Sequence, residues 1–383
     1  MKKQLGGKVI GSGGFGDVYD DVDDIGPIDS ITYYDSTKSK SSFSQKSSKN
    51  IFENTVFKMI EYESALKSEK TNNRIIYKLF KDINKLSLTS LHNRILSVWN
   101  RYDEILVYRK LKTNLVNYLY TPSKDTEKSY YKIFLPTKSD YDNNPEEFIY
   151  ITINNILKFC KNIHENKMIH KDIKIDNILI GDNINDIVLA DYGLLISVDE
   201  DKTIPYDSFQ GMSDYMPPFC HYVDNDKPYY DNYKKRMLFI FFRSPDIASS
   251  QPKGSQIITE KHIDDIINSY DDKNLNKYKI DLHPIGIVLL QLCHRFNISD
   301  DKYISFALKL MMNSSNNDKP ENNGFINAID AYESWQTMKG GSKFINILGR
   351  NRKIYIINGR EHIIYNKNLI TIKQARQVAR KTK

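Results

Sequence analysis

The sequence of 383 residues has no long apolar run, no apolar leader and only three cysteines. Its longest apolar stretches, such as 285–290, are about a third of the roughly 18 residues that a membrane-spanning helix needs. The opening MKKQLGGKVIG lacks the apolar region of a secretory signal. Cys160, Cys220 and Cys293 show no metal-ligand spacing, which indicates reduced thiols. We therefore expect an intracellular protein that is not secreted and has no membrane partner.

Charge is abundant but unevenly distributed. The formal net charge is +7, and 27% of the residues are charged, as in a soluble globular protein. Residues 339–383 contain 12 Lys and Arg against one acidic residue, whereas the rest of the chain has 43 against 47. With Tyr355 and Tyr365 among them, these cations could hold nucleic acid or an acidic protein surface. A solubilising lysine-rich terminus is the alternative.

Local patterns divide the chain into a strand-rich part and a helical part. Residues 36–50 are rich in Ser and Lys and predict a flexible insertion. Apolar periodicity predicts strands at 7–22, 54–60, 74–80, 130–135, 177–180 and 186–190, and helices at 88–112, 146–166, 281–294 and 302–312. Strands thus dominate the first third, and helices dominate the middle.

A glycine-rich stretch lies near the start, where VIGSGGFGDVY places Gly11, Gly13 and Gly16 in a G-x-G-x-x-G-x-V arrangement. The same arrangement marks dinucleotide-binding folds, and it also occurs in ordinary glycine turns. In a dinucleotide site the last glycine opens a helix, whereas GDVYDDV continues with alternating apolar positions like a second strand. A glycine-rich hairpin suits nucleotide phosphates, because backbone N–H groups can approach the oxygen atoms.

The stretch IHKDIKIDNILI, from Ile169 to Ile180, places charges among residues that predict burial. Buried charges need a partner, a hydrogen bond or a metal ion. Asp191, in LADYGL, follows Asn177 by 14 residues. Phosphoryl transfer needs acids that bind metal, an amide near the metal and a base for the attacking hydroxyl, and Asp172, Asn177 and Asp191 supply these types.

With these motifs the sequence resembles the eukaryotic-type serine/threonine protein kinases over most of residues 5–312. HKDIKIDN is similar to the catalytic loop H-R-D-x-x-x-x-N, and DYG to D-F-G. The resemblance implies that Asp172 accepts or orients the hydroxyl proton, that Lys174 contacts the transferring phosphate, and that Asn177 and Asp191 bind Mg²⁺. Lys174 resembles serine/threonine kinases more than tyrosine kinases. DYG and DEILVYRKL loosely resemble the casein-kinase-1-like branch.

The same resemblance implies an ATP site that includes a lysine paired with a helical glutamate. Lys58 in TVFKMI and Lys78 in RIIYKLF both lie in strand-like runs, and Glu104 in DEILVYRKLK is the favoured glutamate. Lys78 precedes Glu104 by 26 residues and Lys58 by 46, so we favour Lys78. The expected ATP-binding residues are Ile10, Gly11, Ser12, Gly13, Gly14, Phe15, Gly16, Val18, Lys78, Lys58 and Glu104.

Two later motifs extend the resemblance, with departures. GMSDYMPPF is similar to G-T-x-x-Y-M-A-P-E, which forms the shelf for substrate peptide, but Phe219 stands in place of the final glutamate. DLHPIGIVLLQL is similar to D-x-W-S-x-G-x-x-L, in which Asp281 begins a buried helix and anchors the catalytic loop. The separation of Phe219 and Asp281 is far longer than the family's usual dozen residues. These departures affect substrate docking rather than the phosphoryl-transfer atoms.

We therefore expect an α+β, two-lobed kinase fold. Residues 1–135 would form a mostly β N-lobe with the insertion at 36–50, and residues 136–338 a mostly α C-lobe with an insertion near 220–280. Residues 339–383 would form a small basic module, because RKIYIINGREHIIY predicts a hairpin turning at Asn358-Gly359, continued by a third segment. This module resembles basic adaptor modules on kinases of large DNA viruses, which would imply the host cytoplasm or the virion.

The expected function is transfer of the ATP γ-phosphoryl group, with Mg²⁺, to Ser or Thr of protein substrates. The main alternative is a pseudokinase scaffold that binds nucleotide or partners without turnover, which the altered A-P-E motif and the insertions favour. A small-molecule kinase is a further alternative, against which GMSDYMPPF argues.

Overall fold

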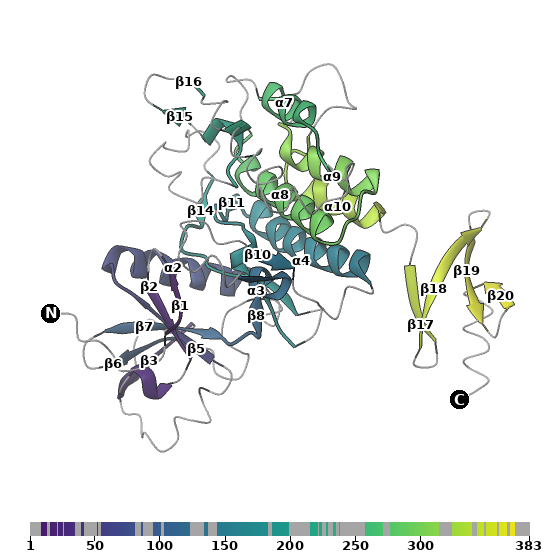
Figure 1. Cartoon of the computed structure of the whole chain (residues 1–383). Coiled ribbons are helices and arrows are strands. Elements are labelled where there is room, and N and C mark those ends of the chain that lie inside the picture. The colour runs from purple at the N-terminus through teal and green to yellow at the C-terminus, as the bar shows by residue number, and fades with distance from the viewer. Residues whose placement is uncertain are drawn as a thin grey trace. The chain divides into compact units, whose positions relative to one another are not determined.

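The protein's structure is a computed structural model (Figure 1). It describes residues 9–13, 16–20, 22–25, 27–34, 40–41, 52, 55–80, 86, 95–100, 103–122, 134–136, 144–182, 186–198, 215–220, 222–223, 227–228, 233–234, 237, 257–270, 276–313, 324–338, 343–347, 350–357, 360–365 and 368–371. The chain forms two compact units, Met1–Ile329 and Asp330–Lys383. No helix in these described ranges is both long and apolar enough to span a membrane.

The N-terminal part of the first unit is built on an antiparallel sheet in the order β1-β2-β5-β7-β6-β3-β4. Its strands are β1 (Val9–Gly13), β2 (Gly16–Tyr19), β3 (Ile28–Tyr33), β4 (Lys40–Ser41), β5 (Thr55–Ile60), β6 (Ile95–Asn100) and β7 (Glu104–Arg109). One face of the sheet carries an apolar cluster, to which Ile31, Phe57, Val98 and Val107 belong. Of the predicted insertion at 36–50, only Lys40 and Ser41 lie within the described residues.

Helix α2 (Glu63–Leu79) follows β5. Two predictions from periodicity are wrong in α2 and in the strands after it. The strand predicted over 74–80 is wrong, because these residues form the end of α2. The helix predicted over 88–112 is also wrong, because β6 and β7 lie there. The buried residues of α2 are Glu69, Asn72, Asn73 and Ile76, a helical stripe in which three of four members are polar. Apolar periodicity therefore could not detect this helix.

The following part is mostly helical, as expected. Helices α4 (Pro145–Glu165), α8 (Lys279–Arg295) and α9 (Asp301–Met311) confirm the predictions at 146–166, 281–294 and 302–312. Nearly all of α8 is buried, and it packs against both α4 and α9. Helices α3 (Leu115–Leu119) and α7 (Glu260–Asn268) also lie in this part, and α10 (Ala328–Met338) crosses into the second unit. The chain thus has a sheet-rich N-terminal region and a helical region after it.

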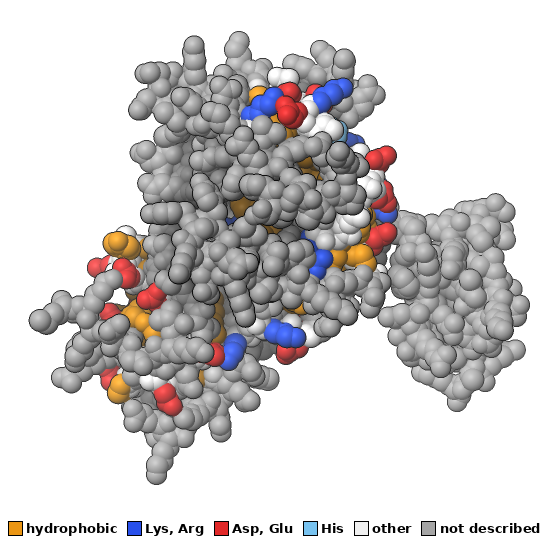
Figure 2. All heavy atoms as spheres, viewed as in Figure 1, with side chains coloured by type: hydrophobic (Ala, Val, Ile, Leu, Met, Phe, Trp, Pro, Cys, Tyr) orange, Lys and Arg blue, Asp and Glu red, His pale blue; other side chains and the backbone are white. Residues whose placement is uncertain are grey.

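Short strands lie between these helices, and some of them carry the motifs at 169–198. They are β8 (Thr113–Asn114), β9 (Tyr120–Pro122), β10 (Phe134–Pro136), β11 (Met168–Ile169), β12 (Ile178–Ile180), β13 (Ile187–Leu189), β14 (Ile196–Ser197), β15 (Tyr222–Val223) and β16 (Lys227–Pro228). The predicted strands at 177–180 and 186–190 correspond to β12 and β13, which pair antiparallel. Acidic and basic side chains are interspersed over the described part of the face in Figure 2.

The second unit contains a four-stranded antiparallel sheet of β17 (Lys343–Ile347), β18 (Arg350–Ile357), β19 (Arg360–Tyr365) and β20 (Asn368–Thr371). Ile357 pairs with Arg360, so the strands of the hairpin predicted around Asn358-Gly359 are present, although the two turn residues lie outside the described ones. Strand β20 continues the sheet as expected, and β17 was not predicted. The adaptor function of this segment remains a prediction.

Candidate active site

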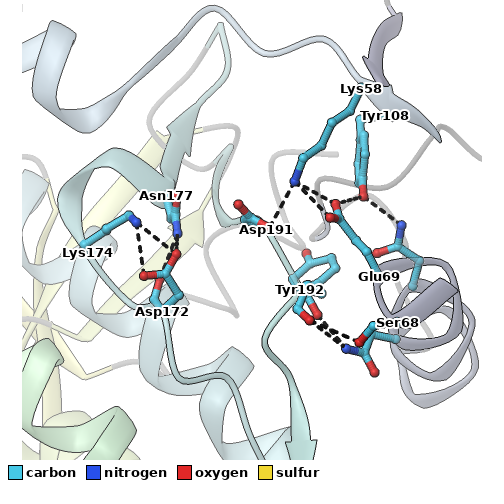
Figure 3. Close-up of polar contacts among 12 residues, drawn as sticks. Lys58, Ser68, Glu69, Tyr108, Asp172, Lys174, Asn177, Asp191 and Tyr192 are labelled. Atoms are coloured by element: carbon cyan, nitrogen blue, oxygen red, sulfur yellow. Dashed lines mark hydrogen bonds and ion pairs between the residues drawn. The ribbon is translucent and has the colours of Figure 1, made fainter. Parts of the chain in front are cut away.

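The catalytic-loop motif brings three of its side chains together (Figure 3). Lys174 Nζ lies 3.0 and 2.9 Å from the two carboxylate oxygens of Asp172. The Asn177 amide donates to Asp172 Oδ2 at 2.7 Å and to the Asp172 carbonyl at 2.8 Å. Because one carboxylate accepts from both neighbours, its position is fixed. The Asp172 side chain is nevertheless 10% exposed, so it is not sealed from solvent.

Asp281 holds the backbone of this loop through hydrogen bonds. It lies in the first turn of α8 and is fully buried, and its carboxylate accepts from the backbone N–H groups of His170 and Lys171 at 2.8 and 2.9 Å. His164 Nε2 lies 3.0 Å from Asp281 Oδ2, while His164 Nδ1 accepts from the Ala328 N–H. The proton of a neutral His164 ring therefore lies on Nε2 and is donated to Asp281. Burial alone would raise the pKa of Asp281, but the hydrogen bonds from the His164 side chain and the His170 backbone help to lower the pKa below its usual value.

The hairpin β12–β13 brings Asn177 and Asp191 to one end of the same ladder. Ile178 pairs with Leu189, and the Ala190 N–H donates to the Asn177 carbonyl at 2.8 Å. Asp191 therefore follows directly on the residue that binds Asn177. It has a φ of 64°, in the left-handed region that few non-glycine residues adopt and that is frequent at functional sites.

The donor set at this end of the ladder fits Mg²⁺. Asn177 turns its amide nitrogen to Asp172, which leaves its side-chain oxygen for a ligand on the other side. The Asp191 side chain is 36% exposed. Carboxylate and amide oxygens are ligands that Mg²⁺ prefers, with water and substrate phosphates completing its shell. Among the described residues there is no group of three or more His, Cys, Asp or Glu that could hold a metal ion.

Lys58 joins the sheet to this cluster. Its ammonium group lies 2.9 Å from both carboxylate oxygens of Glu69 on α2 and 3.2 Å from Asp191 Oδ1 (Figure 3). Lys58 has a side-chain exposure of 13% and Glu69 one of 3%, so this is a largely desolvated ion pair. The pair spans β5 and α2, and the contact with Asp191 connects both to the segment after β13.

The electrostatics of this group favour the charged lysine. Burial alone would lower the pKa of Lys58, but the carboxylates of Glu69 and Asp191 outweigh it and raise the pKa. Burial raises the pKa of Glu69, against the opposing effect of Lys58. Burial would also raise the pKa of Asp191, yet the charge of Lys58 lowers it below its ordinary value. Lys58 therefore stays charged and can bind an anionic ligand.

The predicted pairing of Lys78 with Glu104 is wrong. Lys78 lies exposed in the last turn of α2 rather than in a strand, and Glu104 lies in β7 rather than in a helix. Glu104 is buried and accepts from Lys70 of α2 and from Ser97 of β6. The error follows from the misassigned helix, since a glutamate before Val107 and Leu111 suggested a helical face. Lys58, the less favoured candidate, occupies the position between glutamate and aspartate.

Sequence reasoning did not identify Glu69, Asn72 or Tyr108. Glu69 follows Lys58 by 11 residues, and this spacing was the available signal. Asn72 donates to the carbonyls of Tyr192 and Leu195 at 2.8 and 3.0 Å, which ties α2 to the DYG segment. A Cβ atom on Gly193 would lie 3.2 Å from Glu69 Oε2, so the glycine lets α2 approach closely. These contacts join residues more than 100 positions apart.

Tyr192 of the DYG segment packs between Phe159 and His170. It is fully buried, stacks on Phe159 of α4 at 5.6 Å between ring centroids and meets His170 edge-on at 5.8 Å. Its hydroxyl donates to the Leu189 carbonyl at 2.7 Å. The aromatic contacts therefore fix the chain beside Asp191, so that its carboxylate faces Lys58.

The glycine-rich stretch forms the hairpin β1–β2, in which Gly13 pairs with Gly16. In the β2–β5 ladder Val18 lies directly opposite Lys58, so the hairpin is attached beside the lysine. Gly14 and Phe15 lie outside the described residues, as do the side chains of Ile10 and Ser12. The nucleotide contacts expected of Ile10, Gly11, Ser12, Gly13, Gly14, Phe15, Gly16 and Val18 remain predictions.

Phe219, which stands in place of a glutamate, makes an apolar contact instead of an ion pair. It is buried and packs on Tyr270 at 5.6 Å between ring centroids. The Tyr270 hydroxyl donates to the Met311 carbonyl at the end of α9, at 2.6 Å. Aromatic packing thus stabilises the end of the GMSDYMPPF motif.

Comparisons with known proteins match parts of this chain to protein kinases. A family profile described as protein kinase domain matches residues 39–232, about half of the chain. The membrane-associated tyrosine- and threonine-specific cdc2-inhibitory kinase of Drosophila melanogaster is 30% identical over 126 residues, which are 33% of this chain and 20% of that protein.

The serine/threonine-protein kinase Genghis Khan of the same organism is 32% identical over 77 residues, 20% of this chain and 5% of that protein. The matches thus span a fifth and a twentieth of these relatives. The profile's range includes Lys58, Glu69, Asp172, Asn177 and Asp191. The chain belongs to the protein kinase family.

Proposed function

We propose that the protein transfers the γ-phosphoryl group of ATP, with Mg²⁺, to Ser or Thr side chains of proteins. The observation that carries this proposal is the joint assembly of Lys58, Glu69 and Asp191 beside the group of Asp172, Lys174 and Asn177. Phosphoryl transfer depends mainly on positioning and electrostatic stabilisation, and this arrangement supplies both. A binding scaffold would not need the second group.

In the proposed reaction the substrate hydroxyl oxygen forms a bond to the γ-phosphorus while the bond from that phosphorus to the bridging oxygen of ADP breaks. Asp172 accepts or orients the hydroxyl proton. Lys174, which contacts both Asp172 oxygens, would also face the transferring phosphoryl group, and Lys58 would hold the other phosphates. Asn177 and Asp191 would hold Mg²⁺, which neutralises charge on the phosphate oxygens.

The acceptor class is proposed from the catalytic loop, since Lys174 resembles serine/threonine kinases. One relative is named as specific for tyrosine and threonine and the other for serine and threonine, so threonine is common to both names. The pseudokinase scaffold is the second candidate, and Phe219 is the observation that favours it. For residues 339–383 we propose binding to nucleic acid or an acidic protein surface, because of their 12 Lys and Arg.

The test is Mg²⁺-dependent transfer of ³²P from labelled ATP onto the protein itself and onto casein, followed by phosphoamino-acid analysis. Asp172→Asn should lower transfer by about 10²- to 10⁴-fold. The matched control is Asp176→Asn, an exposed carboxylate of the same loop, which should stay near wild type. Phosphoserine or phosphothreonine from wild type supports the proposal. A folded, ATP-binding protein without transfer supports the scaffold, and phosphotyrosine alone overturns the acceptor class.

A further inference from the structure

Tyr108 lies beside the Lys58–Glu69 pair and has no part in the function proposed above. In the β5–β7 ladder Val56 pairs with Tyr108 and Lys58 with Leu106. Paired residues share a face and side chains alternate along a strand, so Tyr108 and Lys58 project from the same face of the sheet. Both meet α2 on that face (Figure 3).

Two residues of α2 bind the Tyr108 hydroxyl group from either side. The Asn73 amide donates to the phenol oxygen at 2.8 Å, and the phenol donates to Glu69 Oε1. Glu69 and Asn73 are four positions apart on α2, so they lie one turn apart on the same helical face. Because Asn73 donates to the oxygen, the phenol proton is directed to Glu69.

The phenol is a permanent donor in this position. Burial raises the pKa of Tyr108 well above its ordinary value, and the nearby Glu69 carboxylate raises it further, so the hydroxyl stays protonated. Glu69 Oε1 therefore accepts from both Lys58 and Tyr108, while Oε2 accepts from Lys58. When Lys58 turns toward a phosphate, the Tyr108 hydroxyl still donates to Oε1 and holds the carboxylate against rotation.

We propose that Tyr108 is a positioning residue for the ATP-binding lysine, acting through the Glu69 carboxylate. This inference rests on the proposed function, because it assigns to Lys58 the contact with ATP phosphates. Tyr108 would keep Glu69 in place and charged beside Lys58 when ATP competes for the ammonium group. An ordinary core tyrosine would instead contribute only to the attachment of α2.

A second polar contact between α2 and β7, an ion pair, supplies the control. Lys70 of α2 pairs with Glu104 of β7 and does not contact Glu69 in the described contacts. Tyr108→Phe removes the contact of β7 with Asn73 of α2 together with the hydrogen bond to Glu69. Lys70→Gln removes the ion pair with Glu104 and leaves the hydrogen bond to Glu69 intact. Loss of attachment alone would affect both variants alike.

The experiment measures kcat/KM for ATP, KM for casein, and affinity for Mg²⁺-ATP by thermal shift, on the full chain. Tyr108→Phe should lower kcat/KM for ATP and ATP affinity by about tenfold, the usual worth of a hydrogen bond to a charged group. KM for casein should stay within roughly twofold, and Lys70→Gln should keep ATP affinity within the same range. In a Glu69→Gln background, Tyr108→Phe should cause no further loss.

Three results would overturn the proposal: unchanged ATP affinity in Tyr108→Phe, an equal loss in Lys70→Gln, or an undiminished loss in the Glu69→Gln background. Asn73→Ala, which removes the donor that orients the phenol, should lower ATP affinity by a smaller factor and serves if Tyr108→Phe does not fold. Wild type that binds ATP without transferring phosphate would refute the proposed function, while the affinity comparison would still decide the role of Tyr108. Wild type that binds no ATP would overturn both.

Discussion

The two groups that make up the site are held in different ways. The group around Asp172 lies within one short stretch, and the buried carboxylate of Asp281 holds its backbone through two N–H groups. The group around Lys58 is formed by side chains from β5, α2 and β7, and from the segment after β13, which meet through ion pairs and one tyrosine. The first group therefore depends on one buried carboxylate, that of Asp281. The second depends on the position of one helix.

The largest effect should separate Lys58 from Lys78. Lys58→Met removes the cation from between Glu69 and Asp191, so kcat/KM for ATP should fall by about 10²- to 10³-fold. Lys78→Met changes an exposed residue and should leave it within roughly twofold. Steady-state kinetics at varied ATP concentrations measures both. Equal losses, or a larger loss for Lys78→Met, would contradict the assignment made from the ion pairs.

The next effect tests the backbone anchor. Asp281→Asn leaves the N–H groups of His170 and Lys171 facing a weaker acceptor, and the free energy of unfolding should fall by about 3 kcal/mol. Chemical denaturation measures this loss. The matched control is Asp301→Asn at the exposed start of α9, which should change stability by no more than about 0.5 kcal/mol.

The same pair of proteins gives a pH dependence. The pKa of Asp281 is lowered in the folded state, so its stabilising contribution is present above the ordinary aspartate pKa, about 3.9, and is lost as the pH falls through the lower folded value. The difference between wild type and Asp281→Asn should therefore be constant between about pH 5 and 8 and shrink below about pH 4. A difference that grows on acidification would contradict the ionised, hydrogen-bonded state of Asp281.

The smallest effect concerns Glu104, which the sequence analysis paired with the lysine expected to bind ATP. Glu104→Gln weakens its contacts with Lys70 and Ser97 and should lower the free energy of unfolding by about 1 kcal/mol. Transfer from ATP should stay within roughly twofold of wild type. Thermal unfolding and initial rates measure the two quantities. A loss of ATP affinity with unchanged stability would restore Glu104 to the site and weaken the contrast between the two groups.

The contrast also explains which predictions succeeded. Helices α4 and α9 have apolar faces with helical spacing, α8 is a long segment that is buried nearly all round, and the short strands β12 and β13 are apolar, so local pattern identified them. Helix α2 buries Glu69, Asn72 and Asn73, and its burial therefore leaves no apolar signal. Strands β6 and β7 are nearly continuous in burial, and such runs cannot be told from a buried helix by periodicity alone.

The sequence by itself determined the catalytic-loop residues Asp172, Lys174 and Asn177, because they lie within six positions and local backbone geometry brings them together. It also determined that Asp191 follows an apolar strand nearby. Only the tertiary structure decided which lysine and which glutamate meet. That pairing joins β5, α2 and Asp191 across 133 positions of chain, through buried polar contacts whose stability depends on distance and desolvation rather than on any local pattern.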